Sequence, residues 1–279
     1  MQRKIAMSSY KLIAFDMDGT LLNYEKKISA ETAEAVRTAM QQGIIVVFNT
    51  GRCMAELQEY FPILDVPYVN SVSGALVLDR HQNQTIYSNA LPVDTVTKVL
   101  ETARLEDTMI HLLIQQSIVQ KNAIPRMDHY HMEVYRSMYE KVTSTWNNLF
   151  EEYMRDPFPV PKVNLYHTST EARDRTRQRL VEQSLPIEIV NAESTSLEIS
   201  ANGIDKGIGL EKLCEYLHLN MSQVVVVGDA DNDAEAMKKA GLAVAMGNAN
   251  DQIKKLADVI VSDNDHDGCK EVLERFFFI

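Results

Sequence analysis

Short apolar runs are the first pattern along this chain. They are four or five residues long and lie at 11–15, 44–48, 224–227 and 242–246. A strand with one face in water alternates apolar and polar residues, whereas these runs are apolar at nearly every position. That pattern is typical of strands buried on both faces of a sheet.

Helical patterns separate these predicted strands. Ser29 is a suitable N-cap for an alanine-rich segment that stops at Gly43, and the segment 233–240 stops in the same way at Gly241. Strands that alternate with helices favour a mostly parallel sheet. The predicted fold class is therefore α/β, with a Rossmann-like core.

The middle of the chain has a different pattern. Helical stretches at 93–105 and 135–154 and a proline-rich turn at 156–162 are accompanied by short strands at 162–168, 187–190 and 195–200. Such a mixture indicates an α+β module inserted into the α/β domain. We predict a core made of residues 1–88 and 199–279, interrupted by an inserted domain of residues 89–198.

Composition narrows the classes of partner. The chain of 279 residues has 28 Lys and Arg against 39 Asp and Glu, a formal net charge of −11. That charge disfavours nucleic acid or an anionic membrane as the main partner. The three cysteines form no CxxC pair, and we find neither a signal peptide nor an apolar stretch long enough to span a membrane. We expect a cytoplasmic protein.

Polar residues follow three of the predicted buried strands. Asp16 comes after the first, Thr50 and Gly51 after the second, and Asp229 after the strand at 224–227. The carboxyl ends of parallel strands share one crevice, which is where ligands bind in such sheets. We therefore expect these side chains to converge.

Convergence would bring several carboxylates into one place. The acidic residues concerned are Asp16, Asp18, Asp229, Asp231 and Asp233. Like charges at such distances repel one another, so the group needs a cation. An oxygen-only set of ligands, without His or Cys, selects a hard cation such as Mg²⁺.

Four motifs resemble those of the haloacid dehalogenase (HAD) superfamily of phosphotransferases. They are DMDGTL at 16–21, NTGR at 49–52, Lys206 within IDKGIGLEKL, and GDADND at 228–233. The chain is further similar to Cof-type phosphatases through SGALVLD at 73–79, MGNAND at 246–251 and NDHDG at 264–268. The long interval between the second and third motifs matches the Cof-type position of an inserted cap domain, which in this family governs specificity.

The resemblance implies catalytic roles for Asp16 and Asp18. Asp16 would attack phosphorus and form an aspartyl-phosphate, which water then hydrolyses. Asp18 would give a proton to the leaving oxygen and later take one from water. In the same way, Thr50, Gly51, Lys206 and Asn232 would bind the phosphate.

The resemblance also implies a metal site formed by Asp16, Asp18, Asp229 and Asp233. Asp18 would contribute its backbone carbonyl and Asp233 would act from the outer shell, while Asp231 is expected to be solvated. Asn49 and Ser73 depart from the usual Cof-type residues, which are small and Asn respectively. These departures bear on the identity of the substrate more than on the reaction.

The leading hypothesis is a Mg²⁺-dependent phosphatase acting on a small phosphorylated metabolite, such as a sugar phosphate, a nucleotide or a phosphorylated cofactor. A phosphomutase of the phosphomannomutase kind and a non-catalytic phosphometabolite sensor are the alternatives. We expect a monomer or a small homo-oligomer. The sequence does not name the substrate, because no motif can be read in the inserted domain.

Overall fold

The structure is a computed structural model that describes residues 10–191 and 194–278. The described chain forms two compact units. The first contains the residues up to Gly51, residues 59–87 and the residues from Asp205 onward. The second contains residues 52–58 and 88–204. The segment 52–58, which begins at Arg52, the last residue of the second motif, thus groups with the inserted part of the chain.

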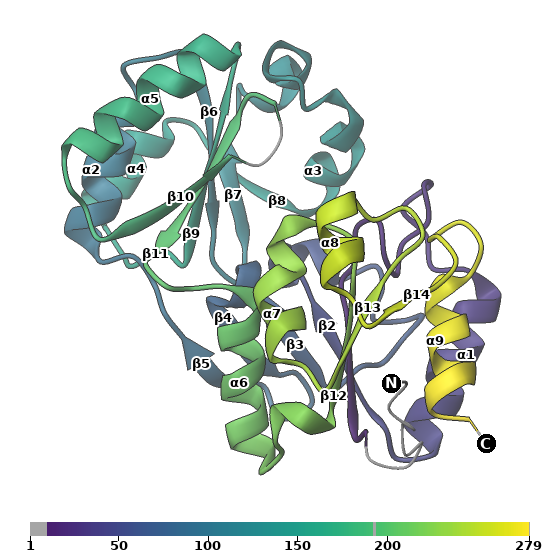
Figure 1. Cartoon of the computed structure of the whole chain (residues 1–279). Helices are drawn as coiled ribbons and strands as arrows, with labels where there is room; N and C mark the ends of the chain where they lie inside the picture. Colours follow the sequence, from purple (N-terminus) through teal and green to yellow (C-terminus); the bar gives the residue numbers. More distant parts are fainter. Residues whose placement is uncertain (1–9, 192–193, 279) are drawn as a thin grey trace. The chain divides into compact units, whose positions relative to one another are not determined.

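The first unit is built on a mostly parallel sheet (Figure 1). Its strands are β1 (Leu12–Phe15), β2 (Ile45–Asn49), β3 (Tyr68–Ser71), β4 (Leu76–Asp79), β5 (Gln84–Ser88), β12 (Val224–Gly228), β13 (Leu242–Ala245) and β14 (Val259–Ile260). Their order is β14-β13-β12-β1-β2-β3-β4-β5. Neighbours from β14 to β3 pair in parallel, and β3 pairs with β4 antiparallel. The four strands predicted from apolar runs are adjacent in this sheet, which confirms the α/β fold class.

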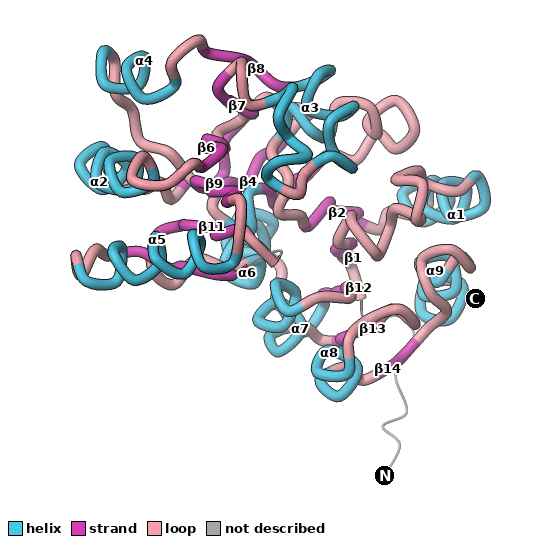
Figure 2. The backbone as a smooth tube through the Cα atoms, turned by 90° about the horizontal axis from the view of Figure 1, so that it is seen from above, coloured by secondary structure: helices cyan, strands magenta, loops and turns pink. Residues whose placement is uncertain are grey.

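Helices cover both faces of this sheet. They are α1 (Ala30–Gln41), α6 (Lys206–Leu217), α7 (Ala234–Lys239), α8 (Asp251–Leu256) and α9 (Gly268–Phe276). Helices α1 and α9 lie on one side and α6, α7 and α8 on the other (Figure 2). The predicted N-cap of α1 is confirmed, because the Ser29 side chain accepts from the backbone N–H of Thr32.

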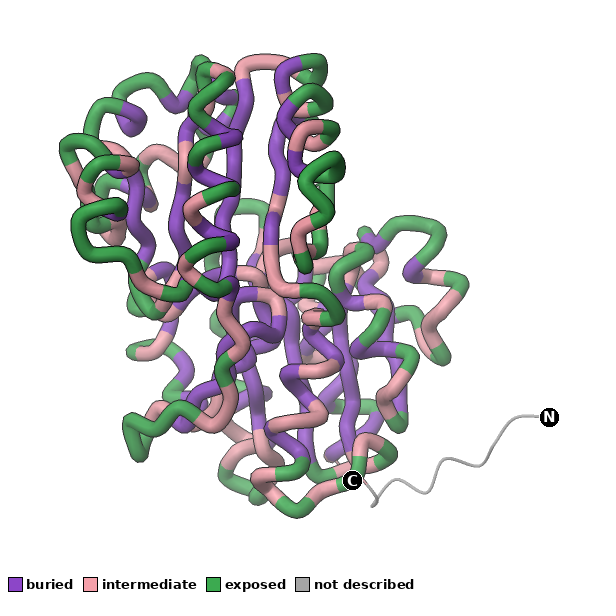
Figure 3. The backbone as a smooth tube through the Cα atoms, turned by 90° about the vertical axis from the view of Figure 1, so that its left-hand side faces the viewer, coloured by how far each residue is buried: buried purple, intermediate pink, exposed green. Residues whose placement is uncertain are grey.

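Alternate residues of the central strands form the apolar core beneath α6 and α7. Leu12, Ala14, Val47 and Val226 pack in one cluster with Leu210 of α6. Figure 3 shows the strands as almost continuously buried, with exposed positions on the outer sides of the helices. Burial on both faces explains why these strands read as unbroken apolar runs.

The second unit is built on a largely antiparallel sheet. Its strands are β6 (Thr108–Leu113), β7 (Ser117–Gln120), β8 (Thr143–Trp146), β9 (Lys162–His167), β10 (Ile187–Asn191) and β11 (Ser196–Ala201). Their order is β10-β11-β9-β6-β7-β8, and only β7 and β8 pair in parallel. The helices of this unit are α2 (Val93–Ala103), α3 (Arg136–Val142), α4 (Leu149–Arg155) and α5 (Thr170–Glu182). The expected α+β character is confirmed.

One predicted helix of this unit is wrong. The segment 135–154 was expected to be continuous, but it forms helix α3, strand β8 and helix α4 in succession. Thr143 and Thr145 are β-branched and pair with β7, so sheet hydrogen bonds replace helical ones there. Asn148 then starts α4 as its N-cap, with its side chain accepting from the N–H of Glu151.

The remaining short elements are 3₁₀ helices. They are η1 (Met54–Leu57), η2 (Val72–Gly74), η3 (Ile124–Tyr130), η4 (Glu133–Tyr135), η5 (Met221–Gln223) and η6 (Asp231–Asp233). In the part of the chain that the structure describes, no helix combines the length and apolar character that crossing a bilayer requires.

Candidate active site

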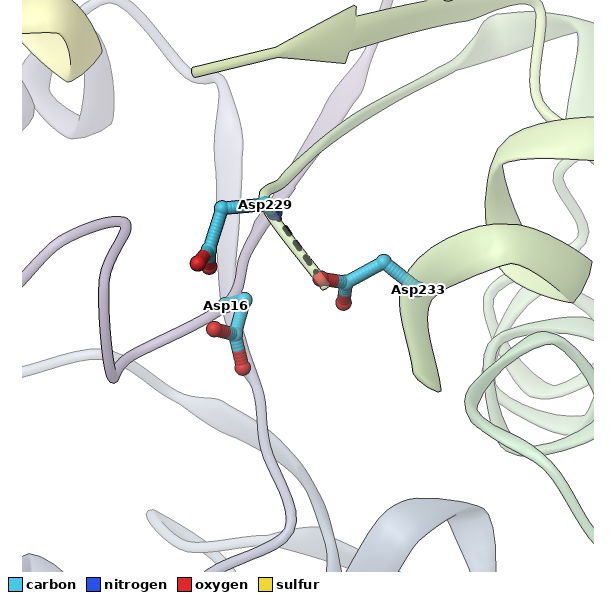
Figure 4. A group of neighbouring side chains, drawn as sticks. All are labelled: Asp16, Asp229 and Asp233. Atoms are coloured by element: carbon cyan, nitrogen blue, oxygen red, sulfur yellow. Dashed lines mark hydrogen bonds between the residues drawn. The ribbon is translucent and has the colours of Figure 1, made fainter. Parts of the chain in front are cut away.

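Acidic side chains gather at the carboxyl ends of β1 and β12. Asp16 directly follows β1, and its backbone N–H donates to the carbonyl of Val227 in β12 over 3.0 Å. Asp229 directly follows β12, and Asp233 ends the 3₁₀ turn that leads into α7. One carboxylate oxygen from each of Asp16, Asp229 and Asp233 lies within 4.8 Å of the others (Figure 4). These strand ends therefore meet as the parallel sheet predicts.

Asp233 is held rigidly inside this group. Its Oδ2 accepts from the backbone N–H of Asp229 at 3.1 Å and from that of Ala230 at 3.3 Å. A Cβ added to Gly228 would lie 2.3 Å from the Asp233 carboxylate. Glycine at the end of β12 is therefore required for Asp233 to lie against the strand.

Lys206 joins two members of the group. Helix α6 begins at this lysine, and the Asp205 side chain caps the helix by accepting from the N–H of Ile208 at 2.9 Å. The Lys206 Nζ donates to Asp16 Oδ1 at 2.6 Å and to Asp233 Oδ1 at 2.7 Å. The lysine side chain is completely buried, so its charge acts on the two carboxylates with little screening by water.

The ionisation of the cluster reflects both burial and repulsion. Burial raises the pKa of Asp16 well above its ordinary value, against the attraction of Lys206, and the negative charges of Asp233 and Asp229 add to the rise. Burial also raises the pKa of Asp229, to about 6. Burial alone would lower the pKa of Lys206, but the two neighbouring carboxylates outweigh it and raise the pKa. The lysine therefore remains charged.

The oxygen ligands that this group offers fit a hard divalent cation. Asp16, Asp229 and Asp233 bring three negative charges against the single positive charge of Lys206. All donors in this group are carboxylate oxygens, the ligands that Mg²⁺ prefers. A divalent cation would offset the remaining charge and relieve the repulsion that raises the pKa values of Asp16 and Asp229.

Two residues that were not assigned from the sequence lie at this site: Thr20 contacts the acidic group, and Asn248 contacts the turn beside it. The Thr20 Oγ1 donates to Asp229 Oδ1 at 2.9 Å, and the Asn248 Nδ2 donates to the carbonyl of Gly19 at 2.8 Å. Gly19 has a φ of +80°, and a Cβ there would lie 2.4 Å from Asp229 Oδ2. Thr20 and Asn248 belong to the quoted motifs DMDGTL and MGNAND, so these motifs could have identified both residues from the sequence.

The Asp18 carboxylate lies apart from the three clustered carboxylates. Its Oδ1 accepts from the Nζ of Lys26 at 2.8 Å, and the two side chains are 38% and 46% exposed. The structure therefore does not bring the Asp18 side chain into the acidic group, although the resemblance gave Asp18 a backbone role at the metal. Asp231 is exposed, in agreement with its expected solvation. Its Oδ1 also accepts from Asn250 Nδ2 at 2.9 Å.

The other predicted phosphate-binding residues have different surroundings. Thr50 is buried after β2, with its N–H donating to the carbonyl of Asn70 at 2.8 Å and its carbonyl accepting from the N–H of Ser73 at 3.0 Å. Gly51 is partly buried and is the last residue of its segment in the first unit. Asn232 is exposed in the turn before α7. The backbone at Thr50 is thus fixed by β3 and the turn that follows it.

The three cysteines are buried free thiols. Cys53, Cys214 and Cys269 are at most 2% exposed. Burial raises the pKa of each thiol, to about 11 in Cys214. A thiol must ionise to act as a nucleophile, and the raised pKa values oppose ionisation of these three thiols at neutral pH.

Comparison with known proteins places this geometry in a family. Residues 13–273 match the family described as haloacid dehalogenase-like hydrolase. The 5-amino-6-(5-phospho-D-ribitylamino)uracil phosphatase YcsE of Bacillus subtilis is 30% identical over 268 residues, which cover 95% of each chain. The HMP-PP phosphatase of Serratia proteamaculans is 28% identical and covers 88% of this chain and 87% of its own.

A solved structure gives the same answer for the fold. The haloacid dehalogenase-like hydrolase from Bacteroides thetaiotaomicron superposes with a TM-score of 0.86 at 28% identity, covering 96% of this chain and all of that one. The family resemblance carried by the four motifs is therefore confirmed over nearly the whole chain. This protein belongs to the haloacid dehalogenase-like hydrolase family.

Proposed function

We propose that this chain is a Mg²⁺-dependent phosphatase that hydrolyses a small phosphorylated metabolite through an aspartyl-phosphate on Asp16. The observation that carries the proposal is the buried lysine bridge. Lys206 contacts both Asp16 and Asp233 within 2.7 Å, beside Asp229, at the carboxyl edge of a parallel sheet. This edge offers a carboxylate nucleophile, a fixed positive charge and a set of oxygen ligands together.

Asp16 is suited to act as the nucleophile. Its hydrogen bond to Lys206 through Oδ1 holds the carboxylate in one orientation. Phosphoryl transfer is governed mainly by positioning and charge neutralisation around an in-line attack. A fixed carboxylate divides hydrolysis into two steps, attack on phosphorus and release by water.

Asp18 is the proposed proton carrier for those two steps. It would protonate the leaving oxygen in the first step and accept a proton from water in the second. Its ion pair with Lys26 is well exposed, and such pairs contribute at most about 1 kcal/mol. This ion pair by itself therefore opposes a turn of the Asp18 carboxylate towards a leaving group only weakly.

Asp16, Asp229 and the backbone carbonyl of Asp18 would hold Mg²⁺, with Asp233 in the outer shell. The ion would neutralise charge on the phosphoryl oxygens and reduce their repulsion of the nucleophile. Lys206, the Thr50 hydroxyl, the backbone N–H of Gly51 and Asn232 would bind the same phosphate. Neutral donors and a buried ammonium are effective there because they need no reorganisation during the reaction.

We further propose that residues 89–198 form a cap domain that selects the leaving group. One face of its sheet is apolar, with Val163 and Leu165 packed among the helices. The opposite face carries polar side chains at the alternate positions of β9, where Lys162 Nζ donates to Glu198 Oε2 at 2.5 Å. Asn164 is two residues after Lys162 on β9 and pairs with Glu198 of β11, and its Oδ1 is buried without a partner among the residues described. A polar leaving group with hydrogen-bond donors would complement this face.

The names of the relatives support the substrate class. Two of them are named as phosphatases of 5-amino-6-(5-phospho-D-ribitylamino)uracil and of HMP-PP. A small phosphorylated metabolite is therefore the class of substrate proposed for this chain.

The three free, buried thiols are consistent with a reducing compartment such as the cytoplasm.

A panel of phosphorylated metabolites and p-nitrophenyl phosphate, assayed with Mg²⁺ for release of inorganic phosphate, tests the proposal. The wild type should release phosphate, with kcat/KM differing among metabolites. Asp16→Asn should release essentially none while keeping the fold, because an amide is a poor nucleophile. Asp231→Asn is the matched control, since its carboxylate is exposed and outside the cluster.

Substantial turnover by folded Asp16→Asn would contradict the aspartyl-phosphate mechanism. Conversion of a sugar phosphate to its isomer without phosphate release would instead indicate a phosphomutase. Saturable binding without any chemical change would indicate a sensor.

A further inference from the structure

Two buried asparagines lie side by side behind the proposed phosphate-binding groups. Asn49 ends β2 and Asn70 lies in β3, and the two are partners in the parallel register of these strands. Both are completely buried. The Asn70 Nδ2 donates to Asn49 Oδ1 at 2.6 Å and to the backbone carbonyl of Lys206 at 2.8 Å. A single amide group therefore connects two strands of the sheet to the first turn of α6.

The register of the sheet places this pair in line with Asp16. Phe15 of β1 is the partner of Phe48 in β2, so the next residues along, Asp16 and Asn49, are neighbours. Asn70 follows in the next strand. Asp16, Asn49 and Asn70 thus form a row, and Lys206 contacts both of its ends. The Lys206 carbonyl accepts a hydrogen bond from Asn70, and its Nζ donates one to Asp16. The position of the lysine backbone at one end thus controls the ammonium at the other.

Helix α6 approaches β3 unusually closely at this point. A Cβ added to Gly209 would lie 1.9 Å from Asn70 Oδ1. Gly74, in the turn after β3, has a φ of +96°, and a Cβ there would lie 1.9 Å from the carbonyl oxygen of Asp205. Glycines at both positions let the start of α6 rest directly on β3 and η2, with the amide of Asn70 as the polar link between them.

The amide pair is not arranged for maximum stability. Asn49 Nδ2 and Asn70 Oδ1 are buried without a hydrogen-bond partner within residues 10–191 and 194–278. Unpaired buried polar atoms are costly, and two apolar side chains of similar volume would avoid that cost. A polar pair that opposes stability in the core is more readily explained by what it positions than by what it stabilises.

We propose that Asn70 is a positioning residue for phosphate binding, with Asn49 fixing the orientation of its amide. Its side chain holds the carbonyl of Lys206, and its backbone carbonyl accepts from the N–H of Thr50 at 2.8 Å. Asn70 therefore links Lys206 and Thr50, the two residues that bind the phosphate in the proposed function. This inference rests on that function. Neither asparagine touches the substrate in this account.

Calorimetric titration of the full chain with inorganic phosphate, in the presence of Mg²⁺, tests the role of the Asn70 side chain. Asn70→Ala removes both donated hydrogen bonds and keeps the backbone carbonyl that holds Thr50. We expect phosphate affinity to fall about tenfold. Ser71→Ala is the matched control, because Ser71 is equally buried on the same strand and donates only to the carbonyl of Leu76 at 3.0 Å. Its phosphate affinity should stay within about twofold of the wild type.

A second background separates positioning from a general structural role. In Lys206→Ala, no ammonium remains to be positioned, so adding Asn70→Ala should change phosphate affinity by less than about twofold. An equal loss in both backgrounds would show that Asn70 does not act through Lys206 and would overturn the proposal. So would an unchanged affinity of Asn70→Ala in the wild-type background.

If Asn70→Ala does not fold, Asn49→Ala gives the deciding measurement. It removes only the acceptor that orients the Asn70 amide, and it should weaken phosphate binding by about threefold. Unchanged affinity in folded Asn49→Ala would also overturn the proposal. A wild type that neither binds phosphate nor releases it from any ester would instead contradict the proposed function, so the two failures are distinguishable.

Discussion

Asp229→Asn should make the metal-free protein more stable at neutral pH while abolishing its use of Mg²⁺. Burial, together with the charge of Asp233, raises the pKa of Asp229 from its ordinary value of 3.8 to about 6 in the folded protein. The ionised carboxylate is therefore disfavoured by folding. The difference corresponds to about 3 kcal/mol, because each pKa unit is worth about 1.4 kcal/mol.

The sign of the pH dependence follows from linkage. A carboxyl whose pKa is raised by folding contributes fully to stability below its unfolded pKa of 3.8, and this contribution is lost as pH rises through about 6. An Asn side chain at position 229 does not ionise, so it loses no stability as the pH rises. Its amide oxygen can still accept from Thr20. The gain from Asp229→Asn should therefore reach about 2 to 3 kcal/mol above pH 7 and vanish near pH 3.5.

Urea unfolding in EDTA, followed by circular dichroism at several pH values, measures this difference. Asp231→Asn is the control, because its exposed carboxylate lies outside the acidic group. Adding Mg²⁺ should reverse the order of stability, since only the wild type keeps the full set of ligands. A variant that is less stable than the wild type in EDTA at all pH values would refute the electrostatic reasoning.

Three further predictions concern the metal, the second unit and the substrate. Activity should disappear in EDTA and return with Mg²⁺, whereas Ca²⁺ should inhibit because its larger and looser coordination misplaces the attacking groups; full activity after exhaustive chelation would contradict this. Glu106→Gln should lower stability by about 1 kcal/mol at pH 7 in urea unfolding, because hydrogen bonds from Arg175 and Arg179 hold the pKa of Glu106 at about 2. A carboxyl with a lowered pKa contributes above its unfolded pKa of 4.5 and loses that contribution as pH falls through about 2, so an equal loss at pH 2 would argue against the ion pairs. Asn164→Leu should change the ranking of metabolites by kcat/KM and leave p-nitrophenyl phosphate hydrolysis nearly unchanged; an unaltered ranking would show that Asn164 takes no part in selecting the substrate.

The central sheet could be predicted from sequence because its strands are buried on both faces. Runs such as 224–227 have no polar position, and polar motifs follow them directly. Periodicity was less informative in the second unit. There, the segment 135–154 has helical spacing throughout, yet pairing of Thr143–Trp146 with β7 interrupts it. Pairing with a distant strand is a tertiary effect that local pattern does not report.

Residues of the candidate site were predictable only where a motif marks them. Asp16, Lys206, Asp229 and Asp233 lie in quoted motifs, and the structure brings them into one group. The contact between Asn49 and Asn70 depends instead on strand register, which joins residues 21 positions apart. No spacing rule in the sequence specifies which residues of two parallel strands become neighbours.

The buried cysteines make this chain a convenient background for fluorescent labelling. Cys53, Cys214 and Cys269 are at most 2% exposed and have raised pKa values, so maleimide dyes should leave the folded wild type nearly unlabelled. Cysteines introduced at exposed Glu182 in the second unit and exposed Lys255 in the first would then be the main reactive sites. Energy transfer between dyes at Glu182→Cys and Lys255→Cys would then measure whether the separation of the two units changes during turnover, without removal of any native thiol.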